Sequence, residues 1–320
     1  MRTLPVLLVI CICLPVILKG QDTGYGPGYQ MMMMHNPGLA GSEPDSKLRL
    51  SYLNFYPGKS YDLHSVYVSY DSYFPGIHGG AGFYLSDDYL GGIINHLRGG
   101  LSYAYSMKAG ADLFINAGLT ASFYHRGFNF SKALLPDQID PLGGFLPTGE
   151  VLTGSSHTVF DIGAGFIFIA GKISGGLSVS HLAEPDLSVS VSSDEKLYRK
   201  VLMHFSGDFE LNSTTGIKIR PLAFMEVQND FISGGPGVVF ENPFLSLNMM
   251  LLANNEKAVD IQTGFSLTTG KLVTFYNYRF NLLSGNNMLP FSLVLQTGLS
   301  YSLNIVEKRK NTRAMDFPKM

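Results

Sequence analysis

The chain has 320 residues and a mass of 35.0 kDa, enough for one large domain or two ordinary ones. Its formal net charge of −2 gives no electrostatic case for nucleic-acid binding. Charged residues make up only 15%, against roughly 25% in soluble domains, while Gly, Tyr and Phe are abundant, which is typical of a transmembrane barrel.

Residues 1–20 have the organisation of a secretory signal. Arg2 supplies a positive charge, Leu4–Leu18 is an apolar run, and cleavage is expected before Gln21. Both cysteines, Cys11 and Cys13, lie here and follow isoleucine, which argues against a lipid anchor and leaves a mature chain without disulfides. No later apolar run approaches the roughly 18 residues that a membrane helix needs. The possible locations of the exported chain are therefore the periplasm, the outer membrane and the exterior.

Residues 21–46 are expected to form an irregular lead-in, because Gly and Pro recur too often for a long helix or strand. We expect this segment to tuck into the mouth of a barrel. Its methionine run, Met31–Met34, is interpreted as flexible apolar filler, with a metal site as the alternative.

The segment 47–306 is predicted to form a barrel of about fourteen strands, because apolar and polar residues alternate along most of it. The last strand, Pro290–Ile305, shows the pattern best, and it is long for a soluble strand of about 5–6 residues. One face is apolar: Phe291, Leu293, Leu295, Thr297, Leu299, Tyr301, Leu303 and Ile305. The other is small or polar: Ser292, Val294, Gln296, Gly298, Ser300, Ser302 and Asn304. The first face would meet lipid and the second would line the lumen.

The predicted connections alternate between tight turns and a mostly longer set: 87–98, 127–156, 183–199, 229–235 and 282–288, with 57–60 and 254–257 as short members. Membrane barrels have short periplasmic turns and longer outer loops, so both termini are placed in the periplasm. The basic tail 307–320 is then expected to be a periplasmic extension, either solvated or docked on a partner. A soluble β-sandwich or lectin is the alternative, since a half-buried sheet also alternates.

Candidate chemistry is sparse. One predicted strand carries the residue types of a hydrolytic triad on a single face: His204, Ser206 and Asp208, with Glu210 beyond. Alternate residues on a strand are about 6.5–7 Å apart, too far for a nucleophile and its base, so we interpret these four as a polar lumen cluster. An outer-membrane hydrolase is the alternative.

Metal and cofactor signals are weak. None of the eight histidines belongs to a ligand motif, and neither a phosphate loop nor a dinucleotide fingerprint occurs, so we predict no metal, no cofactor and no enzyme activity. Asp87-Asp88 is interpreted as a solvated acidic pair in a loop rather than a calcium site, because regular ligand spacing is absent.

Five motifs occur in one order along the chain. They are Asn36-Pro37-Gly38-Leu39-Ala40-Gly41, Ser86-Asp87-Asp88-Tyr89-Leu90-Gly91, Pro136-Asp137-Gln138-Ile139-Asp140-Pro141, His181-Leu182-Ala183-Glu184-Pro185-Asp186, and Arg199-Lys200 with His204 shortly after. In this order they resemble the PorP/SprF membrane proteins of the type IX secretion system of Bacteroidetes. Gly38 for the usual Ala, the methionine run and the basic tail depart from the family pattern.

The resemblance implies a non-enzymatic outer-membrane barrel that supports secretion or surface retention of large proteins such as gliding adhesins. Its partners would be periplasmic ring and scaffold proteins, a secreted client and outer-membrane lipid. Candidate partner contacts are Asn36, Pro37, Gly41, Asp87, Asp88, Pro136, Asp137, Gln138, Asp140, Pro141, Glu184, Pro185 and Asp186.

We assign the 127–156 and 183–199 loops to the client, and the lead-in and tail to the periplasmic machinery. A fourteen-stranded lumen is too narrow for a folded adhesin, which favours an anchor or adaptor over a pore. A passive channel for hydrophobic small molecules is the alternative class.

Overall fold

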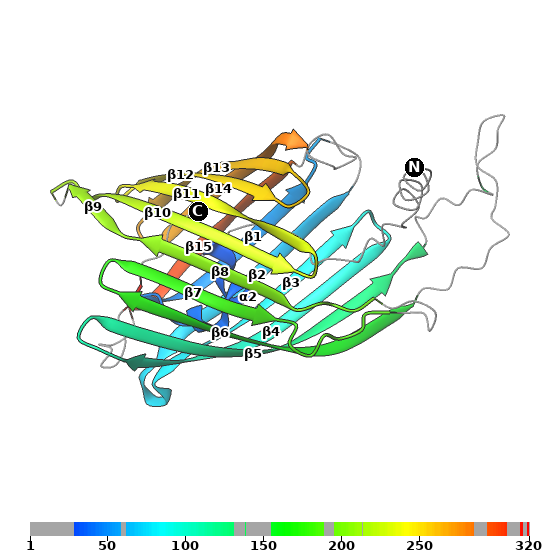
Figure 1. Ribbon diagram of the computed structural model, residues 1–320, viewed down its shortest axis with the longest axis horizontal. Coiled ribbons are helices and arrows are strands. Elements are labelled where there is room, and N and C mark those ends of the chain that lie inside the picture. The colour runs from blue at the N-terminus through cyan, green and yellow to red at the C-terminus, as the bar shows by residue number, and fades with distance from the viewer. Residues whose placement is uncertain are drawn as a thin grey trace, which may run out of the picture.

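The strands pair into one antiparallel sheet that closes on itself, because β11 pairs with β10 as well as with β12 (Figure 1). The computed structural model describes residues 29–58, 62–130, 138, 155–188, 195–212, 214–284, 293–305, 314–315 and 319. β8 and β9 both pair with β10 and are two parts of one strand, so the barrel has 14 strands, as the alternation predicts.

The strands are β1 (Asp45–Phe55), β2 (Leu63–Phe74), β3 (Gly79–Leu90), β4 (Ile94–Lys108), β5 (Leu113–Phe128), β6 (Ser156–Ala170), β7 (Ile173–Ser180), β8 (Lys200–Gly207), β9 (Phe209–Asn212), β10 (Ile217–Gln228), β11 (Phe231–Glu241), β12 (Leu245–Asn254), β13 (Ala258–Thr269), β14 (Leu272–Ser284) and β15 (Val294–Ile305). The helical segments are η1 (Tyr29–Met31), α2 (Met32–His35), η2 (Pro37–Leu39) and η3 (Pro75–Ile77). No helix in the described ranges is long and apolar enough to cross a membrane.

The predicted division into a lipid face and a lumen face is confirmed. Leu119 on β5 and Phe160 on β6 are 66% and 79% exposed, and many other large apolar side chains point outward in the same way. On β15 the inward residues Gln296 and Ser300 are buried. Apolar side chains in this number are stable on an outer surface only where lipid replaces water, as it does around a membrane barrel.

Two predicted loops are wrong. β3 runs to Leu90 and β4 starts at Ile94, so the 87–98 loop is only a short turn and Asp87 and Asp88 lie on a strand. Charges inside an alternating pattern suggest a loop, but Asp88 faces the lumen and is neutralised there by Arg98.

The 229–235 loop also belongs to a strand, because β11 includes Gly234, Gly235 and Pro236 in register with β10. Glycine and proline break most strands, but here the backbones pack closely: a Cβ on Gly235 would lie 2.0 Å from the Leu251 carbonyl oxygen. The long connections of the barrel are therefore 129–155, 181–199 and 285–293, all at its extracellular end.

Candidate functional site

An N-terminal plug, Tyr29–Ser42, occupies the barrel interior. It comprises η1, α2 and η2 and precedes β1, and Figure 1 shows α2 inside the ring of strands. All its residues are buried except Met34 and His35, which are half-buried. The lead-in therefore reaches well past the barrel mouth, where we expect it, and fills the lumen.

Asn36 is both a helix cap and the anchor of the plug. Its Oδ1 accepts a hydrogen bond from the Gly38 amide at 2.9 Å, which caps η2, and Pro37 follows at the first helical position. Its Nδ2 donates to two wall carbonyls, Phe166 at 3.2 Å and Leu177 at 3.4 Å. The side chain is fully buried, so it joins the plug to β6 and β7 without water.

A row of small residues on the wall receives the plug. Strand pairing aligns Gly80, Ala104, Gly118, Gly165 and Ser178 across β3 to β7, all on the lumen face. A Cβ on Gly118 would lie 2.4 Å from the Gly38 nitrogen, and one on Gly165 would lie 2.2 Å from Asn36 Oδ1. The small size of the residues along this row leaves the space into which η2 fits.

A charged clamp holds the other end of the plug. The Gly41 amide donates to Asp71 Oδ2 at 2.8 Å, and Asp71 is paired with Arg49, which also pairs with Glu43. Arg49 and Asp71 are 2% and 3% exposed at their side chains, so each depends on the other for neutralisation. Gly41 has a φ of +60°, a conformation that glycine adopts readily.

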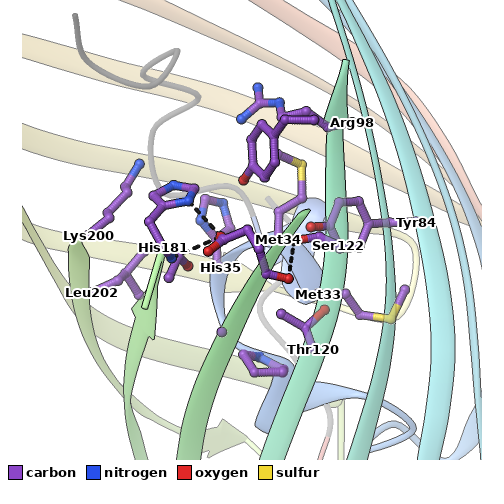
Figure 2. Close-up of a pocket in the computed structure, with 15 residues that line it drawn as sticks. Met33, Met34, His35, Tyr84, Arg98, Thr120, Ser122, His181, Lys200 and Leu202 are labelled. Atoms are coloured by element: carbon purple, nitrogen blue, oxygen red, sulfur yellow. Dashed lines mark hydrogen bonds and ion pairs between the residues drawn. The ribbon is translucent and has the colours of Figure 1, made fainter. Parts of the chain in front are cut away.

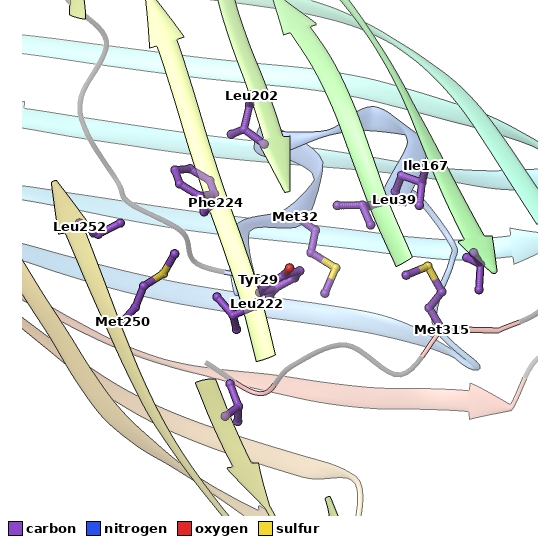
Figure 3. Close-up of a cluster of buried hydrophobic side chains, with 12 residues drawn as sticks. Tyr29, Met32, Leu39, Ile167, Leu202, Leu222, Phe224, Met250, Leu252 and Met315 are labelled. Atoms are coloured by element: carbon purple, nitrogen blue, oxygen red, sulfur yellow. The ribbon is translucent and has the colours of Figure 1, made fainter. Parts of the chain in front are cut away.

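The methionines fill two apolar clusters on either side of the plug. Met31 and Met33 pack with Leu53 and Tyr67, whereas Met32 packs in a cluster with Leu39 and others (Figure 3). The filler interpretation is therefore confirmed for these residues. Unbranched thioether side chains suit such irregular gaps.

Three of the candidate partner contacts lie within the plug. The structure places Asn36, Pro37 and Gly41 inside the barrel, and their contact with a partner stays a prediction. Turn-forming residues are common on exposed loops, and the sequence alone does not show that a wall of glycines will enclose them.

The C-terminal tail also returns to the barrel. We call its described residues, Ala314, Met315 and Lys319, the strap. Met315 is 7% exposed and its amide donates to the Ser42 carbonyl at 2.9 Å. Lys319 pairs with Glu241 at 3.0 Å. These residues therefore contact the barrel itself, while the assignment of the tail to the periplasm stays a prediction.

A small cavity of about 30 Å³ lies on the extracellular side of the plug (Figure 2). Two of its lining residues, Asp161 and His181, form a buried pair with 2.9 Å between Oδ2 and Nδ1. The Tyr124 ring packs edge-on against His181, and Arg98 lies over Tyr124 while pairing with Asp88. The His181 motif therefore begins inside the lumen, where Asp161 fixes the start of an outer loop.

The loop that follows is folded against the rim. Asp186 accepts hydrogen bonds from the amides of Ser188 at 2.8 Å and Glu195 at 3.3 Å, and its backbone forms an isolated antiparallel β-bridge with Lys196. Hydrogen bonds from the hydroxyl and amide of Ser188 lower the pKa of Asp186. The Pro185 carbonyl accepts from the Leu197 amide at 2.9 Å.

Other contacts fix the same loop from below and from the side. Leu187 and Leu197 pack on Tyr124, and Glu184 lies 3.5 Å from Arg199. The candidate contacts Glu184, Pro185 and Asp186 are thus held together on the outer face.

The predicted polar lumen cluster faces inward but forms no single network. His204 packs against Tyr29, Ser206 is 2.8 Å from the Ser174 hydroxyl, and Asp208 lies 3.5 Å from Lys218. Glu210 is exposed at a 350 Å³ vestibule in the periplasmic mouth. Neither ring nitrogen of His204 has a hydrogen-bond partner within the described part of the chain, so no triad is assembled.

The remaining candidates divide into two groups. Asp88 is fully buried, so of the acidic pair only Asp87 reaches the outer side of the wall. Pro136, Asp137, Asp140 and Pro141 lie outside the described residues, and the neighbouring Gln138 is half-buried. Among the described residues no group of three or more His, Cys, Asp or Glu side chains is placed to hold a metal ion.

Sequence reasoning missed the residues that organise the interior. Arg49, Asp71, Arg98 and Asp161 all occupy inward positions of alternating strands. A charge at such a position is a usable signal, because a lumen-facing charge needs a partner. Its partner on a neighbouring strand becomes apparent only once the register is known.

The fold and its interior define a class: a plugged outer-membrane β-barrel. Similar solved structures include the Ralstonia pickettii toluene transporter TbuX, with 12% identity, a TM-score of 0.50, and coverage of 85% of this chain and 93% of that one. The Pseudomonas putida toluene transporter TodX and the CymD monoaromatic hydrocarbon channel have 10% and 11% identity and TM-scores of 0.51, each covering 89% of this chain and 94% of the other. At such identities the similarity shows the fold alone. No curated protein matches the chain.

The family model described as type IX secretion system membrane protein PorP/SprF matches residues 17–314. The chain belongs to this family, as its five motifs suggest, and is an outer-membrane component of type IX secretion.

Proposed function

We propose that this protein is a plugged adaptor of type IX secretion, which holds a secreted client at its outer loops and periplasmic ring and scaffold proteins at its inner face. One observation carries the proposal: the interior is occupied by the chain's own plug and strap. A barrel filled by buried, hydrogen-bonded segments does not serve as the route for a large client, so its contribution must come from its surfaces.

The outer loops are the client-facing candidates. The described parts of the 181–199 loop, 181–188 and 195–199, are fixed to the rim by Asp161 below and by Leu187 and Leu197 beside Tyr124. Residues presented in this way on a rigid wall are suited to binding, because they have little conformational freedom left to lose. The Pro136–Pro141 motif belongs to the longest outer connection, 129–155, and is the second candidate.

Deletion of residues 136–141 tests the assignment. We expect loss of client display at the cell surface, while the barrel keeps its heat-modifiable mobility on gels. A deletion of equal length at 144–149, in the same connection, is the matched control and should retain display. Normal display after the first deletion would show that this motif does not hold client.

A passive channel for hydrophobic small molecules is the second candidate, favoured by the fold shared with hydrocarbon channels. Cavity size weighs against it. The apolar cavity beside Met32 and Phe224 measures about 20 Å³, whereas a cavity that binds benzene measures about 150 Å³. Toluene uptake into liposomes should therefore be negligible for the intact protein and appear only when residues 29–42 are removed. Uptake by the intact protein would favour the channel.

We also infer that residues 1–20 are removed on export. Arg2 followed by the apolar Leu4–Leu18 supports this inference. Mass spectrometry of the protein from outer membranes should give a chain beginning at Gln21, and an intact N-terminus would contradict the inference.

A further inference from the structure

The small cavity beside the plug is lined by two segments that are far apart in the sequence. The plug contributes His35 and residues on either side of it, and the 181–199 loop contributes its first residue, His181 (Figure 2). Side chains from β3 to β8 supply the rest of the described lining. A ligand held in this cavity would therefore lie between the plug and the start of the outer loop.

Two of the residues that line the cavity have unused hydrogen-bonding capacity. Asp161 is 4% exposed, and its Oδ2 atom is hydrogen-bonded to the His181 ring at 2.9 Å and to the His181 amide at 3.1 Å. Its other oxygen, Oδ1, is enclosed without a hydrogen-bond partner in the described part of the chain, and so is His35 Nε2. Buried polar atoms in native proteins are usually satisfied, and ordered water satisfies many of those that protein groups do not reach.

The cavity has the size for water and for little else. Its volume is about 30 Å³, and one water molecule needs roughly 10–15 Å³ measured in this way, so the cavity holds about two. An aromatic molecule such as benzene needs a cavity of about 150 Å³. Size alone therefore limits the ligand to water or a small ion.

The charges around the cavity favour water over an ion. Its cationic side chains are already paired with acids, Arg98 with Asp88 and Lys200 with Glu226 at 3.1 Å. An anion would gain little from them and would be repelled by Asp161, while a cation would be repelled by both basic side chains. Water is neutral, and it can donate to a carboxylate oxygen while it donates to or accepts from an imidazole nitrogen.

We propose that the cavity binds ordered water that bridges Asp161 Oδ1 to the His35 ring, and that this bridge couples docking of the plug to folding of residues 181–188. Asp161 holds the start of the loop through His181, so a change in the loop reaches the plug through the bridge. Coupling of this kind acts equally in both directions. The inference goes beyond the adaptor proposal and does not depend on it, because its tests use the barrel alone and need no client.

Hydrogen exchange in two peptides measures the coupling. His35→Leu removes the imidazole and should raise exchange of 181–188 about fivefold, the loss expected for one hydrogen bond of average strength. Asp161→Ala should raise exchange of 29–42 by about the same factor, because the coupling is reciprocal. In the double variant, exchange of 181–188 should match that of Asp161→Ala within about twofold, because both changes break the same bridge.

Asn36→Ala is the matched control for His35→Leu. Asn36 is the next residue of the plug, but its hydrogen bonds go to the Gly38 amide and to the carbonyls of Phe166 and Leu177. This variant should raise exchange of 29–42 and leave 181–188 at the parent rate, because the docked plug remains the main state and keeps His35. If the two variants have the same effect on 181–188, His35 has no special link to the loop and the proposal is wrong.

A crystal structure of the parent protein tests the bridge without any substitution. Ordered water should lie within hydrogen-bond distance of both Asp161 Oδ1 and a ring nitrogen of His35. A dry cavity, water that touches only one of the two side chains, or a direct hydrogen bond between them would each overturn the bridge.

Discussion

Replacing Asn36 with alanine should release the plug while leaving the barrel folded. Asn36 makes three buried hydrogen bonds, one within the plug to the Gly38 amide and two to the carbonyls of Phe166 and Leu177. The barrel wall keeps its own strand pairing between β6 and β7, so the loss falls on the docked plug alone.

The size of the effect follows from these bonds. A typical internal hydrogen bond contributes about 0.5–1.5 kcal/mol, so the two bonds from Asn36 to the wall give about 2 kcal/mol for docking. Because each 1.4 kcal/mol is a factor of ten, the undocked population should rise roughly 30-fold.

Hydrogen exchange read by mass spectrometry reports this population directly, since buried amides exchange when their segment opens. Peptides covering 29–42 should exchange about 30-fold faster in Asn36→Ala, whereas peptides from β5 should not change. Asn95→Ala, which changes a half-buried asparagine at the outer end of β4, should behave as the parent. Exchange of 29–42 within threefold of the parent in Asn36→Ala would refute Asn36 as the anchor.

Three further outcomes are expected. Gly118→Ala should displace the plug, because its Cβ would lie 2.4 Å from the plug backbone, whereas Gly76→Ala, whose Cβ would meet no atom within 4 Å, should not. Hydrogen exchange of residues 29–42 measures both variants. Equal exchange rates in the two would contradict the role of the small-residue row. Burial, with the positive charge of Lys200 and the nearby His204, lowers the pKa of His35 from 6.5 to about 3. As the pH falls, His35 is therefore protonated in the undocked plug before it is protonated in the docked plug, so docking should weaken below pH 6.5, by up to roughly 30-fold at about pH 5. His35→Gln should remove this pH dependence. Docking of the parent that does not change with pH would refute the role of His35. Asp161→Asn should increase hydrogen exchange in the peptide 181–188 roughly tenfold, whereas Asp230→Asn, which changes an exposed residue, should leave it unchanged. An equal response of the two variants would show that the buried pair of Asp161 and His181 does not order the loop.

The barrel wall is predictable because its rule is local. Alternation along β5 or β15 identifies the lipid face from single residues such as Leu119 and Gln296, without knowledge of any partner strand. The rule fails where the lumen face carries a charge, as at Asp88 on β3, and where a strand contains a turn former, as at Pro236 on β11. There the deciding term is a contact on another strand, Arg98 for Asp88, which the linear sequence does not contain.

The interior was less predictable for the same reason. Asn36 and Gly41 are identified as special by their motif, but their roles depend on Gly118, Gly165 and Asp71, at least 30 residues away. The strap is similar, since nothing in Met315 or Lys319 marks them as lumen residues until the cluster around Met32 is known.

The departures from alternation carry the information about the interior. Inward glycines such as Gly118 and Gly165 pair with each other across β5 and β6, so the wall is thin where they meet. Because no side chain stands between them, Asn36 reaches the wall backbone and donates to the carbonyls of Phe166 and Leu177. The inward charges Arg49 and Asp71 mark the other end of the same segment. In a membrane barrel whose outside is fixed by lipid, paired inward glycines and inward charges therefore point to a bound internal segment, and here they lie at the two ends of the plug.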